Sequence, residues 1–175
     1  MESSSLNNLT TVKFKSLHKQ EIGYAELFSG YRTMIFSIPK PVDQKAFWQL
    51  KSFAENFNTI KKLRIDKLCC VSFEPLIVPY IEAHLETHST DIIPIHDYST
   101  NFVSYLKEYT NSTVTLKTLC NLWQYVVIID NGKIEKLFSN PVKDNMPLKI
   151  YYDSRYKFRN LDTNTIIEYL KSTQQ

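Results

Sequence analysis

The sequence contains few glycines and few cysteines, and each scarcity excludes a class of site. Only 3 of the 175 residues are glycine. Phosphate-cradling loops of the Walker and Rossmann kinds need several glycines at fixed spacing, because the backbone must approach the phosphate closely. Neither fingerprint is present, so both kinds of nucleotide loop are excluded. The 3 cysteines, an odd number, argue against a disulfide framework and fit a reducing compartment, which we expect to be the cytoplasm.

Long hydrophobic runs are also missing. No stretch of about eighteen apolar residues occurs, so we expect neither a transmembrane helix nor a membrane partner. The first residues, Met1–Thr11, are polar and lack the apolar core of a secretory signal. We expect residues 1–20 to be a loose N-terminal segment. Residues 21–175 contain no repeat and no low-complexity linker, and we expect them to form a single domain.

Charge of one sign is not concentrated either. The formal net charge is only +3. The densest basic run, Lys61–Arg64, is followed directly by Asp66, which is typical of a solvated helix surface. A dedicated nucleic-acid binder usually gathers its basic residues on one stripe. Nucleic acid is therefore not the favoured partner.

What the sequence does contain is an alternation of short apolar runs and helical periodicity. Apolar runs bounded by turn signals predict buried strands at residues 33–38, 67–73, 92–95 and 123–129. Apolar residues at helical spacing predict helices at about 43–58, 76–88, 102–109 and 164–171. Asn131-Gly132 between two strand patterns predicts a tight hairpin, because both residues tolerate positive φ, and residues 134–138 form the return strand. This order predicts an α/β fold with a thioredoxin-like mixed sheet, mostly parallel, flanked by helices.

Several segments, taken in order, resemble the peroxiredoxins, above all the redoxin group that includes peroxiredoxin-5. Leu27–Gly30 followed by Met34–Pro39 is similar to the approach to that family's active-site loop. Cys70–Phe73 lies where the group has a strand ending in a Val/Leu-Ser pair. Trp123–Ile134 is similar to the late strand, its Asp/Asn-Gly turn and the return strand. The resemblance runs from about residue 26 to residue 138 and implies a peroxiredoxin-like domain.

The resemblance also shows which catalytic positions have changed. The family places a cysteine thiolate at a helix N-terminus, a threonine one turn earlier and a loop proline between them. Read without a gap from Pro39, the threonine position falls on Asp43, the proline on Gln44 and the cysteine on Ala46. If one residue is missing, the cysteine position is Lys45 or Gln44 instead. No reading provides a cysteine. Asp43 itself is better interpreted as an N-cap of the helix.

The family's arginine, which lowers the pKa of the peroxidatic cysteine, falls near Gln124 with no arginine beside it. The joint loss of these groups predicts a peroxiredoxin-like protein that lacks the peroxidatic cysteine and is a non-catalytic binding or regulatory protein. The resemblance implies a homodimer or another protein partner. No cofactor and no metal site is expected.

One alternative is a thiol-dependent peroxidase or oxidoreductase that uses a cysteine in a non-standard position. Cys69 and Cys70 are adjacent on a predicted strand, so their side chains should point to opposite faces, which opposes a disulfide between them. Buried packing is the favoured interpretation for both. Cys120 precedes the late strand and could be a surface thiol with a resolving or regulatory role. His96-Asp97, at a predicted strand end, lies where α/β folds bind ligands but has no nucleophile partner in the sequence.

A second alternative is a binder of nucleic acid or of an anionic surface. Aromatic and basic residues alternate near the C-terminus, and such interleaving can stack bases and contact phosphates. It can equally cover a protein partner or pack against the sheet edge. The candidate interaction residues are Tyr151, Tyr152, Arg155, Tyr156 and Arg159.

Overall fold

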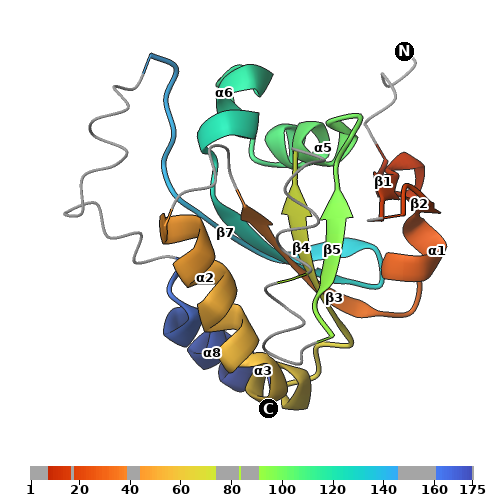
Figure 1. The fold of residues 1–175 in the computed structure, drawn as a ribbon, viewed down its shortest axis with the longest axis vertical. Coiled ribbons are helices and arrows are strands. Elements are labelled where there is room, and N and C mark those ends of the chain that lie inside the picture. The colour runs from red at the N-terminus through yellow and green to blue at the C-terminus, as the bar shows by residue number, and fades with distance from the viewer. Residues whose placement is uncertain are drawn as a thin grey trace.

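A seven-stranded mixed sheet forms the centre of the molecule (Figure 1). The computed structural model describes residues 8–16, 18–38, 44–73, 83, 91–145 and 161–174, with the backbone alone for 44–47. The strand order is β2-β1-β5-β4-β3-β6-β7. The strands are β1 (Phe14–Lys15), β2 (Glu21–Ile22), β3 (Arg32–Ile38), β4 (Lys67–Ser72), β5 (Ile93–His96), β6 (Tyr125–Asp130) and β7 (Lys133–Ser139).

Parallel pairing is confined to the three strands β3, β4 and β5. The other pairings, β1 with β2 and β5, and β6 with β3 and β7, are antiparallel. The mixed α/β sheet predicted from the sequence is confirmed, but the expectation that it is mostly parallel is wrong. The reason is that β6 enters beside β3 in the antiparallel sense, and that a short hairpin, β1–β2, extends the other edge.

Six helices and one short 3₁₀ turn belong to the described residues. They are η1 (Leu9–Thr11), α1 (Tyr24–Leu27), α2 (Gln44–Glu55), α3 (Phe57–Lys62), α5 (Asn101–Tyr109), α6 (Leu116–Leu122) and α8 (Thr163–Ser172). The predicted helices at 43–58, 102–109 and 164–171 correspond to α2 with the start of α3, to α5 and to α8. The helix predicted at 76–88 lies outside the described residues, apart from the helical Ala83. None of the described helices is long and apolar enough to cross a membrane.

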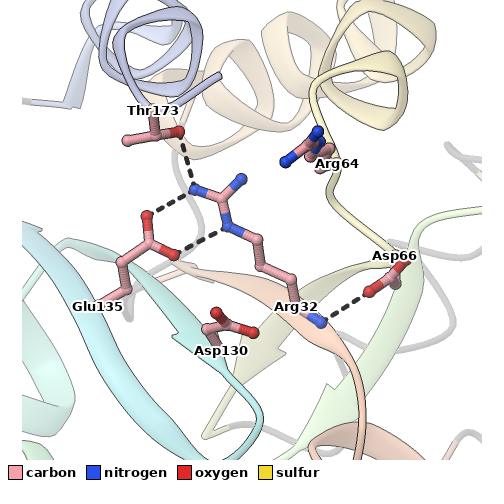
Figure 2. A pocket seen from close by; sticks show the side chains of 6 residues that line it. All are labelled: Arg32, Arg64, Asp66, Asp130, Glu135 and Thr173. Carbon is pink, nitrogen blue, oxygen red and sulfur yellow. Dashed lines mark hydrogen bonds and ion pairs between the residues drawn. The ribbon is translucent and has the colours of Figure 1, made fainter. Parts of the chain in front are cut away.

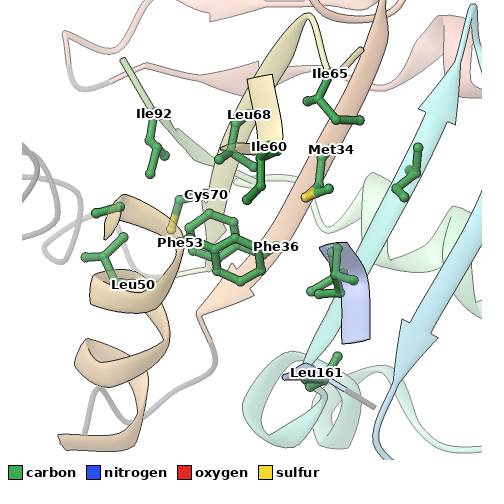
Figure 3. Packing of buried hydrophobic residues seen from close by; sticks show 14 of the residues in the cluster. Met34, Phe36, Leu50, Phe53, Ile60, Ile65, Leu68, Cys70, Ile92 and Leu161 are labelled. Carbon is green, nitrogen blue, oxygen red and sulfur yellow. The ribbon is translucent and has the colours of Figure 1, made fainter. Parts of the chain in front are cut away.

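Two hydrophobic layers cover the two faces of the sheet. Helices α2, α3 and α8 pack on one face, where the rings of Phe36 and Phe53 stack with centroids 4.1 Å apart (Figures 1 and 3). Helices α1, α5 and α6 pack on the other face, around Ile35, Val71 and Tyr125. Alternate residues of each strand supply the two layers, as the pleat of a strand requires.

Part of the N-terminal segment belongs to the second layer. Leu9, Val12 and Phe14 are buried, and the ring of Phe14 meets Phe102 of α5 edge to face at 5.2 Å. Residues 8–16, which the sequence analysis assigned to a loose segment, therefore contribute a strand and three core side chains. Val12 and Phe14 alternate with lysines as strand residues do, but the alternation covers only four residues of an otherwise polar segment.

The predicted hairpin between β6 and β7 is confirmed. Asn131 and Gly132 have φ values of 47° and 79°, the left-handed pair that a two-residue type I′ turn needs. The Asn131 side chain accepts a hydrogen bond from the Gly30 N–H at 2.8 Å, which ties the turn to the loop before β3. Glycine is favoured at position 132 for its conformation, and a Cβ there would also require the end of the Tyr24 side chain to move.

Candidate functional site

The carboxyl ends of β3, β4 and β5 meet at one edge of the sheet, which we call the carboxyl edge. In α/β folds this is where ligands and catalytic residues gather. Helix α2 begins at Gln44, directly after the segment that follows β3, and Ala46 lies in its first turn. Pro39 and Asp43 lie outside the described residues. The helix start predicted at about residue 43 is thus confirmed to within one residue.

Hydrogen bonds between uncharged groups connect the chain segments at the carboxyl edge: Ser37 of β3, the residues that enter β6, and Asn140 after β7. The buried Ser37 hydroxyl donates to the Trp123 carbonyl at 3.2 Å and accepts from the Tyr125 N–H at 2.9 Å. Gln124 is buried, its N–H donates to the Asn140 side chain at 2.8 Å, and its carbonyl accepts from the Asn140 N–H at 3.2 Å. Gln124, the residue near which the resemblance puts the family's arginine, is thus a buried neutral residue whose main chain is held by Asn140. That it occupies the arginine's position stays a prediction.

Cys69 and Cys70 are fully buried in the middle of β4 and belong to opposite layers, as predicted from strand alternation. Both are free thiols. Figure 3 shows Cys70 among the apolar residues around Phe36 and Phe53. Burial raises the pKa of Cys69 to about 12, although Lys67 opposes the change. Burial, followed by the neighbouring Cys69, raises the pKa of Cys70 well above its ordinary value.

Cys120 lies in α6, a helix that the sequence analysis missed, and is half-buried. Burial and the nearby Asp97 carboxylate raise the pKa of its thiol to about 11. All three thiols are therefore protonated at neutral pH. A protonated thiol is a poor nucleophile, since the thiolate is the reactive species.

Asp97 follows β5 directly, at the carboxyl edge. It is 1% exposed and accepts hydrogen bonds from the N–H groups of Phe102 and Val103, at 3.3 and 3.1 Å, so it caps α5. Burial raises its pKa to about 6 against the effect of the two hydrogen bonds. The buried hydroxyl of Tyr125 has no hydrogen-bond partner among the described residues. Burial, with Asp97 and Cys120 next in effect, raises the pKa of Tyr125.

His96, the neighbour of Asp97, has a structural contact. Its Nε2 lies 3.1 Å from the Phe73 carbonyl, and burial lowers its pKa. Sequence reasoning placed His96 and Asp97 at a strand end, which is confirmed, but it did not find the helix cap. The sequence gives little sign of this cap, because Thr100, directly before α5, is in the more usual capping position. Thr100 has a φ of 59°, however, and its side chain makes no capping hydrogen bond. Asp97 caps the helix instead.

Two sequence predictions concern the aromatic–basic residues near the C-terminus and a metal site. The aromatic–basic residues from Tyr151 to Arg159 lie outside the described residues. Across the ranges that are described, no group of three or more His, Cys, Asp or Glu side chains is arranged to hold a metal ion.

Comparison with known proteins gives one consistent similarity. No protein-family model matches the sequence. A curated protein, peroxiredoxin sll1621 of Synechocystis, is 23% identical over 153 residues, covering 85% of this chain and 75% of its own. Reduced Prx3 of Vibrio vulnificus in complex with hydrogen peroxide has a TM-score of 0.65 at 19% identity, covering 96% and 99% of the two chains.

Two further solved structures agree. The 1-Cys peroxiredoxin of Plasmodium falciparum has a TM-score of 0.63 at 19% identity, covering 87% of this chain and 83% of its own. Peroxiredoxin 5 of Alvinella pompejana has a TM-score of 0.54 at 13% identity, covering 75% and 85%. The predicted thioredoxin-like, peroxiredoxin-like fold is confirmed by these similarities.

Proposed function

Because this chain has the peroxiredoxin fold and resembles a peroxiredoxin in sequence, we propose that it is a non-catalytic member of that group, which binds a protein partner in place of reducing peroxide. The observation that carries the proposal is that the three cysteine thiols are protonated and that none lies at the start of α2.

The helix start at α2 has no sulfur to offer an oxidant. No cysteine occurs before Cys69, so none stands in the first turn of α2 or in the segment before it. The positive end of a helix dipole lowers the pKa of a thiol only within its first turn. Peroxide reduction also needs the thiolate to attack one peroxide oxygen while the other leaves as hydroxide. Without a thiolate at this position the family's mechanism has no first step.

The thiols that the chain does contain are poorly suited to replace it. Cys69 and Cys70 are fully buried in the sheet, and the pKa of each is raised by burial. Cys120 is the one reachable thiol, because it is half-buried, and its pKa of about 11 leaves on the order of one molecule in ten thousand as thiolate at pH 7. This half exposure is the observation that favours the rival function, a thiol peroxidase based on Cys120.

The surface of α2 supports a binding role. Trp48 is 68% exposed and, with Lys51, Ser52 and Glu55, lines a shallow hollow of about 280 Å³. Lys51 Nζ and Glu55 Oε1 are 3.7 Å apart and bring opposite charges to the same hollow. An exposed tryptophan surrounded by polar groups is typical of the centre of a protein–protein contact. The hollow lies on α2, the helix whose start the resemblance aligns with the family's peroxidatic site.

A peroxide-consumption assay tests the proposal. Purified protein should consume hydrogen peroxide in the presence of a thiol reductant no faster than the Cys120→Ser variant, because no thiol reacts. A peroxiredoxin-like rate in the wild type would overturn the non-catalytic function. If that rate disappeared in Cys120→Ser but persisted in Cys69→Ser, the rival based on Cys120 would replace it.

Thiol labelling in the native state provides an independent measurement. We expect Cys69 and Cys70 to react only on unfolding, and Cys120 to react slowly, with a rate that still rises above about pH 9 as its thiolate forms. A cysteine that labels rapidly at neutral pH would show a lowered pKa and contradict the proposal.

A further inference from the structure

A cavity of about 580 Å³ opens at the end of the sheet opposite the carboxyl edge (Figure 2). Here β3 and β4 begin and β6 ends, so we call it the amino edge. The residues that line the cavity are Arg32, Arg64, Asp66, Asp130, Glu135 and Thr173. Its volume falls within the range of about 300–1,000 Å³ that is usual for small-molecule sites. It is made from segments far apart in the sequence.

The floor of the cavity is a fixed, internally neutral ion pair. Arg32 Nε donates to Glu135 Oε2 at 2.8 Å, and its Nη2 donates to Glu135 Oε1 at 2.5 Å and to Thr173 Oγ1 at 3.1 Å. The second terminal nitrogen donates to the Leu63 carbonyl at 3.3 Å, and the Tyr169 hydroxyl donates to Glu135 Oε1 at 2.9 Å. These contacts hold both side chains in place. The floor therefore provides shape without net charge.

The rim of the cavity carries two exposed, oppositely charged side chains. Arg64 and Asp130 are exposed, and neither side chain makes an ion pair or hydrogen bond with another described residue. Figure 2 shows them on either side of the Arg32 side chain. Asp66 lies on the same rim, where its carboxylate accepts the Arg32 N–H at 2.8 Å. A guanidinium and a carboxylate are thus available to a ligand at one opening.

We propose that this cavity binds a small zwitterion, a free amino acid or a short peptide with free termini. Its carboxylate would meet the Arg64 guanidinium, which matches that group in a bidentate manner, and its ammonium group would meet Asp130. A purely anionic ligand is disfavoured by the three carboxylates of the lining, and a purely cationic one by the exposed Arg64. The proposal goes beyond the proposed function, because it concerns the other edge of the sheet and does not depend on the loss of peroxidase activity.

Arg64 offers an unusually clean variant. Its φ of 64° lies in the left-handed region, where glycine is favoured and an arginine is strained. Arg64→Gly therefore removes the recognising charge while relieving backbone strain, so the variant should fold at least as stably as the wild type. A loss of binding in Arg64→Gly is then a loss of recognition and not of structure.

The experiment is a calorimetric or NMR titration of the full chain with glycylglycine, beside N-acetylglycine, which has no ammonium group. We expect glycylglycine to bind, Arg64→Gly to weaken binding by at least about tenfold, and Asp130→Asn to weaken it severalfold. Lys117→Ala, on α6 and away from this cavity, is the matched control and should leave the affinity unchanged. The proposal is overturned if glycylglycine does not bind at any soluble concentration, if Arg64→Gly binds it as well as the wild type, or if N-acetylglycine binds equally well. None of these readouts involves peroxide, so they are separate from the test of the proposed function.

Discussion

The two edges of the same sheet differ in where they keep their polar groups. At the carboxyl edge, Ser37 and Asp97 are buried and their side chains accept backbone N–H groups, Gln124 is buried as well, and the thiols nearby are protonated. At the amino edge, Arg32 and Glu135 form a partly exposed bidentate pair, and Arg64 and Asp130 are exposed at the rim without a partner among the described side chains. Chemistry in this kind of fold normally occupies the carboxyl edge. Among the described residues, Arg64 and Asp130 place accessible charge at the opposite edge.

Under the proposed function, this difference teaches how a fold can be kept while its site is closed by neutral side chains. A catalytic site of this kind needs access to solvent and a titratable group whose charged form is stabilised. Both are lost when neutral side chains cover the site, because burial disfavours the charged form. Apolar packing under the carboxyl edge and ionic contacts at the amino edge should therefore contribute to stability in measurably different ways.

The largest effect is expected from the apolar layer beneath the carboxyl edge. Phe53→Ala should lower the free energy of unfolding by about 4 kcal/mol, because the ring is fully buried, stacks on Phe36 and would leave a cavity. Urea unfolding measures the change. Phe57→Ala, at a partly buried ring of the same layer, is the matched control and should cost clearly less. Equal costs would mean that the layer is not the tightly packed core described above.

The next effect concerns the ion pair of the amino edge. Arg32→Met should lower the free energy of unfolding by roughly 3 kcal/mol, because it leaves the mostly buried Glu135 carboxylate without its charged partner. The double variant Arg32→Met/Glu135→Met should recover a large part of that loss, since it buries no lone charge. If the double variant were as unstable as the sum of the two single ones, the pair would not act as a unit.

These regions also show how far sequence reasoning reaches. The strands β3, β4 and β6 and the Asn131-Gly132 turn were predictable because their signals are local: a short apolar run, or two turn residues side by side. The opposite facing of Cys69 and Cys70 followed from the pleat alone. Helix α6 was missed because its apolar residues directly precede an apolar strand, so the change of period has no visible boundary.

The amino-edge site could not be predicted from the sequence. Arg32 and Glu135 are 103 residues apart, and their contact depends on β6 lying between β3 and β7. No local pattern records that order. The sequence predicts a solvated surface position for Arg64, and Arg64 is exposed. Nothing in the sequence indicates that Asp130 lines the same cavity. Side-chain contacts of this kind depend on the order of the strands in the sheet. The sequence predicted the fold class but not that order.

A smaller effect is expected at the turn that leads from Asp130 into β7. Gly132→Ala should cost about 2 kcal/mol, because alanine is strained at a φ of 79° and its Cβ would overlap the Tyr24 ring. Gly30→Ala is the matched control: its φ of 76° imposes the same backbone strain, but no atom lies within 4 Å of the added Cβ. The difference in melting temperature between the two variants isolates the contact with Tyr24. A Gly30→Ala variant as unstable as Gly132→Ala would show that backbone strain accounts for the whole loss.

The smallest effect tests the buried charge of the carboxyl edge through pH. The pKa of Asp97 is raised in the folded state to about 6, so the folded protein binds a proton more tightly than the unfolded chain, whose Asp97 has an ordinary pKa. Stability from this group therefore rises as the pH falls through about 6 and levels off near the unfolded value, about 4. Between pH 7 and pH 5 the gain should be about 1 kcal/mol.

Neighbouring groups decide how this gain is measured. His96 acts in the opposite direction, because burial lowers its pKa and the unfolded chain takes up its proton first, while Cys120 and Tyr125 titrate far above this range. The wild type must therefore be compared with Asp97→Asn, which keeps the shape and one acceptor of the helix cap but cannot titrate. The difference between the two proteins in free energy of unfolding should move by about 1 kcal/mol in favour of the wild type from pH 7 to pH 5. A difference that stays constant across this range would mean that Asp97 is not a buried carboxylate with a raised pKa, and that the carboxyl edge is as open to water as the amino edge.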